Sequence, residues 1–197
     1  MGRPNLSAER RGKFLPVIAS SFVERGYRRT TTAELAAACG VQETTLYRLW
    51  PGKKAMFLAA IEYVYQLSAG TWEKVLESSV KGESGAERLL RYESQHLGEF
   101  GLYRIIFAGL TETDDSEIRS ALRLMFRSFH EEISGRIEEH RGQHPRKRGV
   151  DSAQAAWAFI GLGMVANLSR DVKLFGEGKR QSLIAEVGAL LLEGEVP

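Results

Sequence analysis

The sequence predicts an all-α fold of about nine helices, in which a small three-helix domain with a helix-turn-helix precedes a larger helical domain. Two observations predict this class. Apolar residues recur at spacings of three and four along most of the chain, which is the period of one face of a helix. Capping patterns, in which serine, threonine or aspartate precedes glutamate or glutamine by three residues, stand before several of these stretches.

The first helix is expected to begin at Ser7, a polar cap, and to run to about Arg25, where Gly26 stops it. Its apolar face consists of Phe14, Val17, Ile18, Ser21 and Phe22. Positions with this spacing pack one side of a helix on a core.

Residues 31–50, TTAELAAACGVQETTLYRLW, have the layout of a helix-turn-helix. Thr31 and Glu34 form a capping box at the start of the first motif helix. Gly40 permits the left-handed turn that ends this helix, and ETTLYRLW forms a second short helix that ends at Pro51. Two short helices joined by a tight turn with glycine place a helix in the major groove of DNA.

Polar side chains cover the expected outer face of the second motif helix, whereas Leu46 and Trp50 are expected to face inward. Gln, Thr, Tyr and Arg side chains donate to base edges and phosphates. The candidates for contact with bases are Gln42, Glu43, Thr44, Thr45 and Arg48. Lys53 follows at the start of the next helix, where a cation and free amides meet a phosphate. The alternative is a solvated helical hairpin inside another all-helical protein.

The stretch GVQETTLYRLWPGKKAM, with Thr31 and Ala36 before it, resembles the amino-terminal DNA-binding domain of the TetR family of bacterial repressors. The matching positions are Thr31, Thr32, Ala36, Gly40, Val41, Thr45, Leu46, Tyr47, Trp50 and Lys53. The resemblance covers roughly residues 8–60 and departs at Glu43 and Thr44. It implies that Thr31, Thr32, Tyr47 and Lys53 hold phosphates. Glu43 repels phosphate but accepts a hydrogen bond from a cytosine amino group, so the operator sequence stays open.

Six further helices are expected after the motif. A long one runs from Lys53 toward Ser78. Three others begin at capping pairs: Ser84 with Glu87, Asp114 with Glu117, and Asp151 with Gln154. The Asp114 helix runs to about Glu139. A short apolar helix starts at Gly101, and the last helix covers about 179–193.

Aromatic side chains with a few polar tips gather in the middle of the chain and suggest an effector pocket, since ligand pockets are largely apolar. The candidates are Trp72, Tyr92, His96, Phe100, Tyr103, Phe107, Phe126, Phe129, His130 and Trp157. Such a set favours a small lipophilic or aromatic effector. The alternative is that these residues are plain core. The family resemblance implies that a ligand there releases the DNA.

The last two helices are expected to pair with those of a second copy. AAWAFIGLGMVANL is apolar nearly all round and must be buried, and its small residues let another helix approach. The interface candidates are Ala155, Phe159, Gly163, Met164, Ile184, Val187 and Leu191. A two-fold homodimer pairs two reading helices and requires a palindromic site. The alternative is that both helices belong to the core of the monomer.

Charge is divided unevenly along the chain. Residues 1–60 hold ten Lys and Arg against four Asp and Glu, a net charge of +6, whereas residues 61–197 carry a net charge of −4. A basic part beside an acidic part fits a module that binds a polyanion. We therefore expect a DNA-binding domain over residues 1–60 and an effector-binding and dimerisation domain over residues 61–197.

The sequence gives little support for an enzyme, a metal-binding protein or a membrane protein. Gly161, Gly163 and Ala166 fit a dinucleotide fingerprint but lack the strand that must precede it, so helix packing is the interpretation. The four histidines show no zinc spacing, and Cys39 is expected to pack, with redox sensing as the alternative. No cofactor or metal is expected. The longest apolar run is too short for a membrane span, and the polar start is no signal peptide, which predicts a cytoplasmic protein.

The sequence thus predicts a DNA-binding transcription regulator without enzymatic activity. Its partners are double-stranded DNA and a second copy of itself, and its mode is that of a ligand-released repressor on a palindromic operator. Two alternatives remain: a helix-turn-helix scaffold for protein contacts, and an all-helical ligand-binding enzyme. The salt dependence of duplex binding separates the scaffold from a DNA reader.

Overall fold

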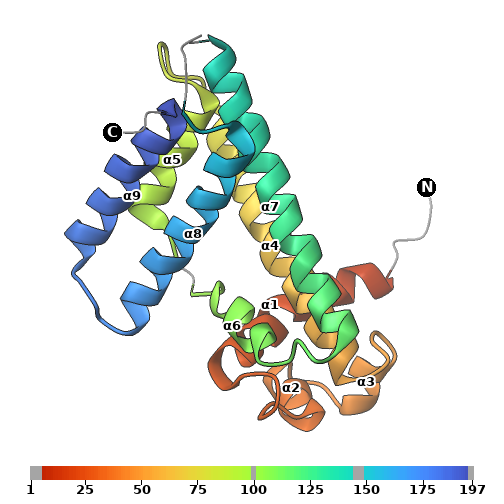
Figure 1. Ribbon diagram of the computed structural model, residues 1–197. Coiled ribbons are helices and arrows are strands. Elements are labelled where there is room, and N and C mark those ends of the chain that lie inside the picture. The colour runs from red at the N-terminus through yellow and green to blue at the C-terminus, as the bar shows by residue number, and fades with distance from the viewer. Residues whose placement is uncertain (1–5, 99–100, 144–148, 195–197) are drawn as a thin grey trace, which may run out of the picture. The chain divides into compact units, whose positions relative to one another are not determined.

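The computed structural model describes residues 6–98, 101–143 and 149–194, and over these residues the chain forms helices and turns without strands (Figure 1). The predicted all-α class is confirmed. The helices are α1 (Leu6–Arg25), α2 (Thr32–Ala38), α3 (Glu43–Tyr47), α4 (Lys53–Glu77), α5 (Gly85–His96), α6 (Arg104–Leu110), α7 (Ser116–Gln143), α8 (Ser152–Asp171) and α9 (Glu177–Glu193). Within the described residues, no helix has the length and hydropathy to cross a membrane.

Two compact units make up the described part of the chain. The first contains α1, α2, α3 and α6, with α4 up to Ser68 and α7 up to Met125. The second contains α5, α8 and α9, with α4 from Ala69 and α7 from Phe126. The functional boundary expected at residue 60 stays a prediction, because contacts within a unit do not say which part binds DNA.

Capping chemistry explains where most of the helices begin. The predicted capping boxes of α2 at Thr31, α5 at Ser84 and α8 at Asp151 are confirmed, since each cap side chain accepts from the N3 amide. Each N3 side chain also bonds the amide of its cap, so two free donors are satisfied at once.

Two predicted caps are wrong. Ser7 lies inside α1, which already includes Leu6, so it does not cap that helix. At the start of α7 it is Asp115, not Asp114, whose carboxylate accepts from the amides of Glu117 and Ile118, at 2.9 and 3.2 Å. Neighbouring aspartates give the same capping pattern, and only the backbone direction separates them.

The core of the first unit is aromatic. The rings of Phe22 and Phe57 meet edge to face with centroids 4.9 Å apart, and Tyr27 lies at the same distance from Phe57. Gly26 stops α1 as predicted, with φ of +77°, and so lets the chain turn toward α2. Ile18 is fully buried beside this cluster on the predicted face of α1.

The second unit has α9 packed on both α5 and α8 (Figure 1). The close approach requires glycine at Gly188, because a Cβ there would lie 2.4 Å from Leu90 Cδ1 and 3.2 Å from Phe159 Cε1. Ala155 and Ala156 of α8 are fully buried in the same cluster. Small side chains therefore bring these helices together.

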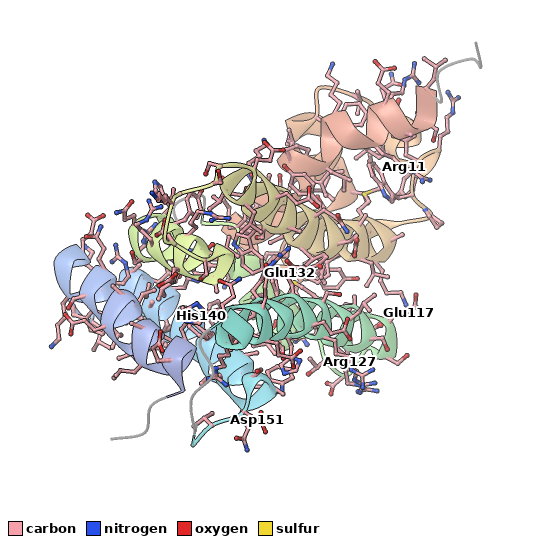
Figure 2. The ribbon with its side chains drawn as sticks, turned by 90° about the horizontal axis from the view of Figure 1, so that it is seen from above. Arg11, Glu117, Arg127, Glu132, His140 and Asp151 are labelled. Carbon is pink, nitrogen blue, oxygen red and sulfur yellow. The ribbon has the colours of Figure 1, made fainter. Side chains whose placement is uncertain are left out.

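Two buried polar residues at the end of α7, His140 (labelled in Figure 2) and Arg141, fix the neighbouring helices. The His140 ring bonds Ser84 Oγ at 2.8 Å and Glu193 Oε1 at 3.1 Å, which links α5, α7 and α9. The guanidinium of Arg141 donates to the carbonyls of Leu191 and Leu192. A cation at the carboxyl end of α9 satisfies carbonyls that have no partner within the helix.

We expect Gly188→Ala to lower the free energy of unfolding by about 1–3 kcal/mol, since overpacking a close helix contact forces neighbouring side chains aside. Gly135→Ala on α7 is the matched control, because a Cβ there meets no atom within 4 Å. It is expected to stabilise by about 0.5–1 kcal/mol through helix propensity. Urea unfolding measures both variants. Equal effects of the two changes would contradict the close approach.

Candidate nucleic-acid interface

The helix-turn-helix predicted over residues 31–50 is present as α2, a tight turn and α3. Gly40 has φ of +67°, the left-handed conformation that favours glycine. The amides of Gly40 and Val41 bond the carbonyls of Ala37 and Ala36, each at 3.0 Å. The turn is therefore closed by backbone bonds, and it fixes the direction in which α3 leaves α2.

The inner face of α3 is anchored by apolar side chains. Leu46 is fully buried, and Leu49 and Trp50 are buried just after the helix. The helix itself ends at Tyr47, earlier than the predicted ETTLYRLW. Pro51 disfavours the helical conformation of Trp50 and so prevents the helix from continuing beyond it. The chain nevertheless keeps turning, since the amides of Leu49 and Trp50 both bond the Leu46 carbonyl at 2.9 Å.

The outer face of α3 is polar and accessible. Gln42, Thr44, Tyr47 and Arg48 are exposed, and Glu43 and Thr45 are half-buried. All the side chains predicted to contact bases thus keep surface that a partner can reach. Together they make a short polar ridge.

Hydroxyl groups from both motif helices meet at the edge of this ridge. The Thr32 and Tyr47 hydroxyls lie 2.9 Å apart, within hydrogen-bond distance, although 15 residues separate them. Thr31, the cap of α2, is exposed next to them. The residues that the family resemblance assigned to phosphates therefore stand partly together.

Lys53 is held in place from behind. Its Nζ donates to the Tyr27 carbonyl at 3.0 Å and lies 4.4 Å from the centroid of the Tyr27 ring. An ammonium group carries three donors, so two remain for another acceptor. The fixed position reduces the side-chain entropy that a lysine loses when it meets a phosphate.

Arg11 supports the motif, and sequence reasoning missed it (Figure 2). Its Nη2 donates to the Leu49 carbonyl at 2.7 Å, and its guanidinium lies 5.9 Å from the Trp50 ring centroid. α1 thereby holds the chain directly after the reading helix. No local pattern reveals a contact over 38 residues.

Several cations of the basic amino-terminal region are paired with carboxylates. Arg25 Nη1 lies 2.5 Å from Glu34 Oε1. The pKa of the Glu34 carboxyl is lowered, first by the hydrogen bond from the Thr31 amide and then by the Thr31 hydroxyl, with Arg25 adding to the effect. The capping carboxylate of α2 is thus kept ionised.

Two further cations of this region, Arg28 and Lys54, pair with carboxylates at the start of α7 or just before it, within the first unit. Arg28 Nε lies 2.9 Å from Glu112 Oε1. Lys54 Nζ contacts both Asp115, at 3.2 Å, and Glu117. The pKa of Asp115 is lowered, first by the hydrogen bond from the Ile118 amide and then by the bond from Lys54. The pKa of Lys54 is raised, first by its bond to Glu117 and then by its bond to Asp115.

The predicted effector residues form separate ring pairs. Trp72 meets Phe129 edge to face at 5.5 Å between centroids, Tyr92 stacks on His96 at 4.3 Å, and His130 stacks on Trp157 at 4.5 Å, all in the second unit. Tyr103 and Phe107 pair at 6.4 Å in the first unit. Phe126 is half-buried, and Trp157 is exposed. Phe100 lies outside the described residues.

The predicted interface residues differ in exposure. Ala155 and Ile184 are buried within the chain, and Val187 is exposed. The others, Phe159, Gly163, Met164 and Leu191, are half-buried. Exposed apolar side chains that this prediction did not name are Val165 and Leu168 on α8 and Leu190 on α9.

Cys39 follows the end of α2 and is half-buried, and burial raises the pKa of its thiol. A thiol that stays protonated is a weak nucleophile, which agrees with packing as its role. Across the described residues, no three His, Cys, Asp or Glu side chains are grouped as metal ligands.

Comparison with known proteins shows which family has this sequence and this fold. Residues 15–60 match the family described as bacterial regulatory proteins, tetR family. The nucleoid occlusion factor SlmA of Citrobacter koseri is 30% identical over 149 residues, which cover 74% of this chain and 75% of that protein. The identity extends well beyond the residues that the family match covers.

Solved structures show the same fold. A TetR-family transcriptional regulator from Cytophaga hutchinsonii matches with a TM-score of 0.80 over 100% of both chains, at 18% identity. The transcriptional regulator FadR from Bacillus subtilis, in complex with stearoyl-CoA, matches with a TM-score of 0.72 over 94% of this chain and 99% of that chain, at 16% identity. The chain belongs to the TetR family and is a DNA-binding transcription regulator, not an enzyme.

Proposed function

We propose that the chain is a repressor that binds a palindromic operator as a homodimer and leaves it when a small ligand binds. As a regulator of transcription, it works in the bacterial cytoplasm, where the chromosome lies. The observation that carries the proposal is the two-sided build of α3. Its inner side chains, with Leu46 at the centre, are buried, whereas Gln42, Thr44, Tyr47 and Arg48 point outward.

The proposed base contacts come from Gln42, Glu43, Thr44, Thr45 and Arg48. A five-residue helix presents few side chains, so it reads a short half-site. Arg48, the C-cap of α3, donates two parallel bonds to a guanine in the major groove. Glu43 lies in the first turn, where the helix dipole favours a carboxylate, and accepts from a cytosine amino group.

The proposed phosphate contacts come from Thr31, Thr32, Tyr47 and Lys53. The hydroxyls of Thr32 and Tyr47 lie 2.9 Å apart, and one donates to the other. The accepting hydroxyl keeps its own proton free for a phosphate oxygen. Lys53 adds a charge that is held by Tyr27. Groups of this kind fix the register on DNA without reading its sequence.

We assign the two functions, DNA binding and ligand binding with dimerisation, to the two sides of about residue 60. Residues 1–60 bind DNA, and residues 61–197 bind the ligand and the second copy. The exposed apolar side chains of α8 and α9 support dimerisation through these helices, because Val165, Leu168, Val187 and Leu190 would otherwise stay in water. The two-fold dimer pairs two α3 helices.

The proposed ligand is small and lipophilic or aromatic. The Bacillus subtilis regulator of the same fold holds stearoyl-CoA, which supports a guest with an apolar body. In this chain, the half-buried ring pairs of Trp72 with Phe129 and of Tyr92 with His96 support such a guest, because they are aromatic surface within the second unit. Release of DNA requires the ligand to bind the two states with unequal affinity.

A second role, nucleoid occlusion, is favoured by one observation. The Citrobacter koseri factor of that name shares 30% identity over 149 residues, so the likeness is not confined to the reading head. A factor that acts on the whole nucleoid needs sites spread over the chromosome, whereas a local repressor needs few. A chromosome-wide map of bound sites therefore separates the two roles.

Selection from random duplexes tests the proposed mode of DNA binding. We expect an inverted repeat whose half-sites are centred about one helical turn, roughly 34–36 Å, or a multiple of it apart, because two α3 helices are related by a two-fold axis. A selected site without dyad symmetry would speak against the homodimeric mode. The absence of any enriched sequence at low salt would refute sequence-specific reading.

Arg48→Ala and Lys53→Ala are expected to weaken binding in different ways. Arg48→Ala costs about 1–3 kcal/mol and relaxes preference at one position of each half-site, because a base contact is lost. Lys53→Ala weakens all duplexes alike and makes the salt slope shallower by about one counterion per subunit. Anisotropy titrations at several salt concentrations measure both, with the exposed Lys74→Ala on α4 as the control. Unchanged preference at every position would remove Arg48 from the reading set.

Val187→Glu is expected to convert the homodimer into monomers and to abolish tight operator binding, since a charge placed in an apolar interface is left without a partner. Light scattering and sedimentation measure the mass. Val80→Glu is the control, because Val80 is also exposed but lies between α4 and α5. A monomeric wild-type protein at micromolar concentration would contradict the dimer.

A further inference from the structure

Three carboxylates of the first unit lie between the end of α6 and the first turn of α7, and they bind cations of the amino-terminal region. We call Glu112, Asp115 and Glu117 the acidic trio. Arg28 Nε donates to Glu112 Oε2 at 3.1 Å. Lys54 Nζ donates to Asp115 Oδ2 at 3.2 Å and also to Glu117. Negative charge in a domain that binds a polyanion costs affinity through repulsion. The net effect of the trio on DNA affinity therefore depends on what these carboxylates hold in place.

The cations that the acidic trio binds are chain neighbours of the donor and the acceptor of the bond that holds Lys53. Arg28 directly follows Tyr27, whose carbonyl accepts from Lys53 Nζ at 3.0 Å. Lys54 directly follows Lys53 at the start of α4. The trio is therefore tied to both ends of the hydrogen bond that fixes Lys53.

The Tyr27 side chain connects the acidic trio with Lys53 in a second way. Burial raises the pKa of the Tyr27 hydroxyl, Asp115 and Glu112 raise it further, and the charge of Lys54 opposes them. The Lys53 ammonium lies 4.4 Å from the centroid of the Tyr27 ring. One side chain thus lies close both to the trio and to the lysine.

The ion pair of Arg28 with Glu112 restricts position more than it adds stability. The Arg28 side chain keeps 75% of its surface exposed, and exposed ion pairs contribute little to the free energy of unfolding. The Glu112 side chain keeps only 11%, and its Oε1 accepts from the Thr111 hydroxyl at 3.1 Å. An enclosed carboxylate with a second bond has a fixed position, so it also fixes the guanidinium that it binds.

We propose that Glu112, Asp115 and Glu117 are positioning residues for the phosphate contact of Lys53, and that these carboxylates therefore raise the affinity of the protein for DNA. The inference rests on the proposed function, because it takes Lys53 as a phosphate contact. A lysine whose supporting residues are fixed loses less side-chain entropy when it meets a phosphate. Long-range electrostatics alone gives the opposite sign, since each carboxylate repels a polyanion. The sign of the effect therefore separates the two descriptions.

Glu112→Gln in the full-length protein tests the sign. Positioning predicts that the affinity for the duplex obtained by selection falls by about threefold per subunit, and so by about tenfold for a dimer. Loss of a repelling charge alone tightens binding instead. Anisotropy titrations at one fixed salt concentration measure the change, and urea unfolding shows that the variant is folded. Unchanged or tighter binding by Glu112→Gln overturns the proposal.

Asp114→Asn is the matched control. Asp114 is exposed in the same segment, and within the described residues it forms no ion pair. The change removes the same charge at a similar place, so it is expected to leave the affinity unchanged or to raise it slightly. A loss as large as that of Glu112→Gln would assign the effect to charge in this segment and overturn the positioning role.

A double-mutant cycle with Lys53→Ala shows whether the carboxylate acts through the lysine. We expect Glu112→Gln to weaken binding in the wild-type background and to have no effect, or to tighten binding, when Lys53 is absent. A purely structural role gives the same loss in both backgrounds, and that result overturns the proposal. If Glu112→Gln does not fold, the exposed Glu117→Gln, which loses the bond from Lys54, carries the same cycle.

The same measurements separate this inference from the proposed function. If Lys53→Ala weakens binding and Glu112→Gln does not, the phosphate contact stands and the positioning role is wrong. If Lys53→Ala leaves the affinity unchanged, the proposed phosphate contact itself fails. If no duplex is selected, the proposed operator reading fails, and a duplex of random sequence carries the cycle, because phosphate contacts do not depend on sequence. A loss on Glu112→Gln that disappears with Lys53→Ala supports the positioning role on either duplex.

Discussion

The reading surface depends on burial of the side chains behind a helix that is too short to be stable alone. α3 has five residues, and isolated helices of that length do not form in water. Leu46 and Trp50 are buried beneath it, the turn at Gly40 fixes its start, and Arg11 bonds the Leu49 carbonyl after its end. The polar side chains on the outer face of α3 therefore take their positions from packing and from backbone bonds. The exposed side chains are free to vary in chemistry without loss of the helix.

Local sequence patterns predicted the presence of the helices well and the positions of their ends less well. The capping boxes at Ser84 and Asp151 are recognisable because cap and N3 residue lie three positions apart in sequence as in space. The signal failed at Asp115, where two adjacent aspartates fit the same pattern. It also failed at the end of α3, where Leu49 and Trp50 keep the apolar spacing of a helix although the helix ends at Tyr47. Periodicity records which side chains are buried, and it does not record which backbone bond is the last one.

Some features of the candidate site were likewise predictable from the sequence, and others were not. Exposure of Gln42, Tyr47 and Arg48 follows from the period of one short helix and was predictable. The contacts of Lys53 with Tyr27 and of Arg28 with Glu112 join residues 26 and 84 positions apart, and no single-sequence pattern encodes them.

The carboxylates of the first unit determine which of its cations remain without a neighbouring negative charge. Glu34, Glu112 and Asp115 lie against Arg25, Arg28 and Lys54, so the local fields of these three cations largely cancel over a few ångströms. The exposed Arg48 guanidinium has no carboxylate partner in the described part of the chain. The number of cations that attract a polyanion at long range is therefore smaller than the number of Lys and Arg residues in this part of the sequence. Electrostatic steering of this kind raises the rate of encounter with a duplex more than it raises the affinity.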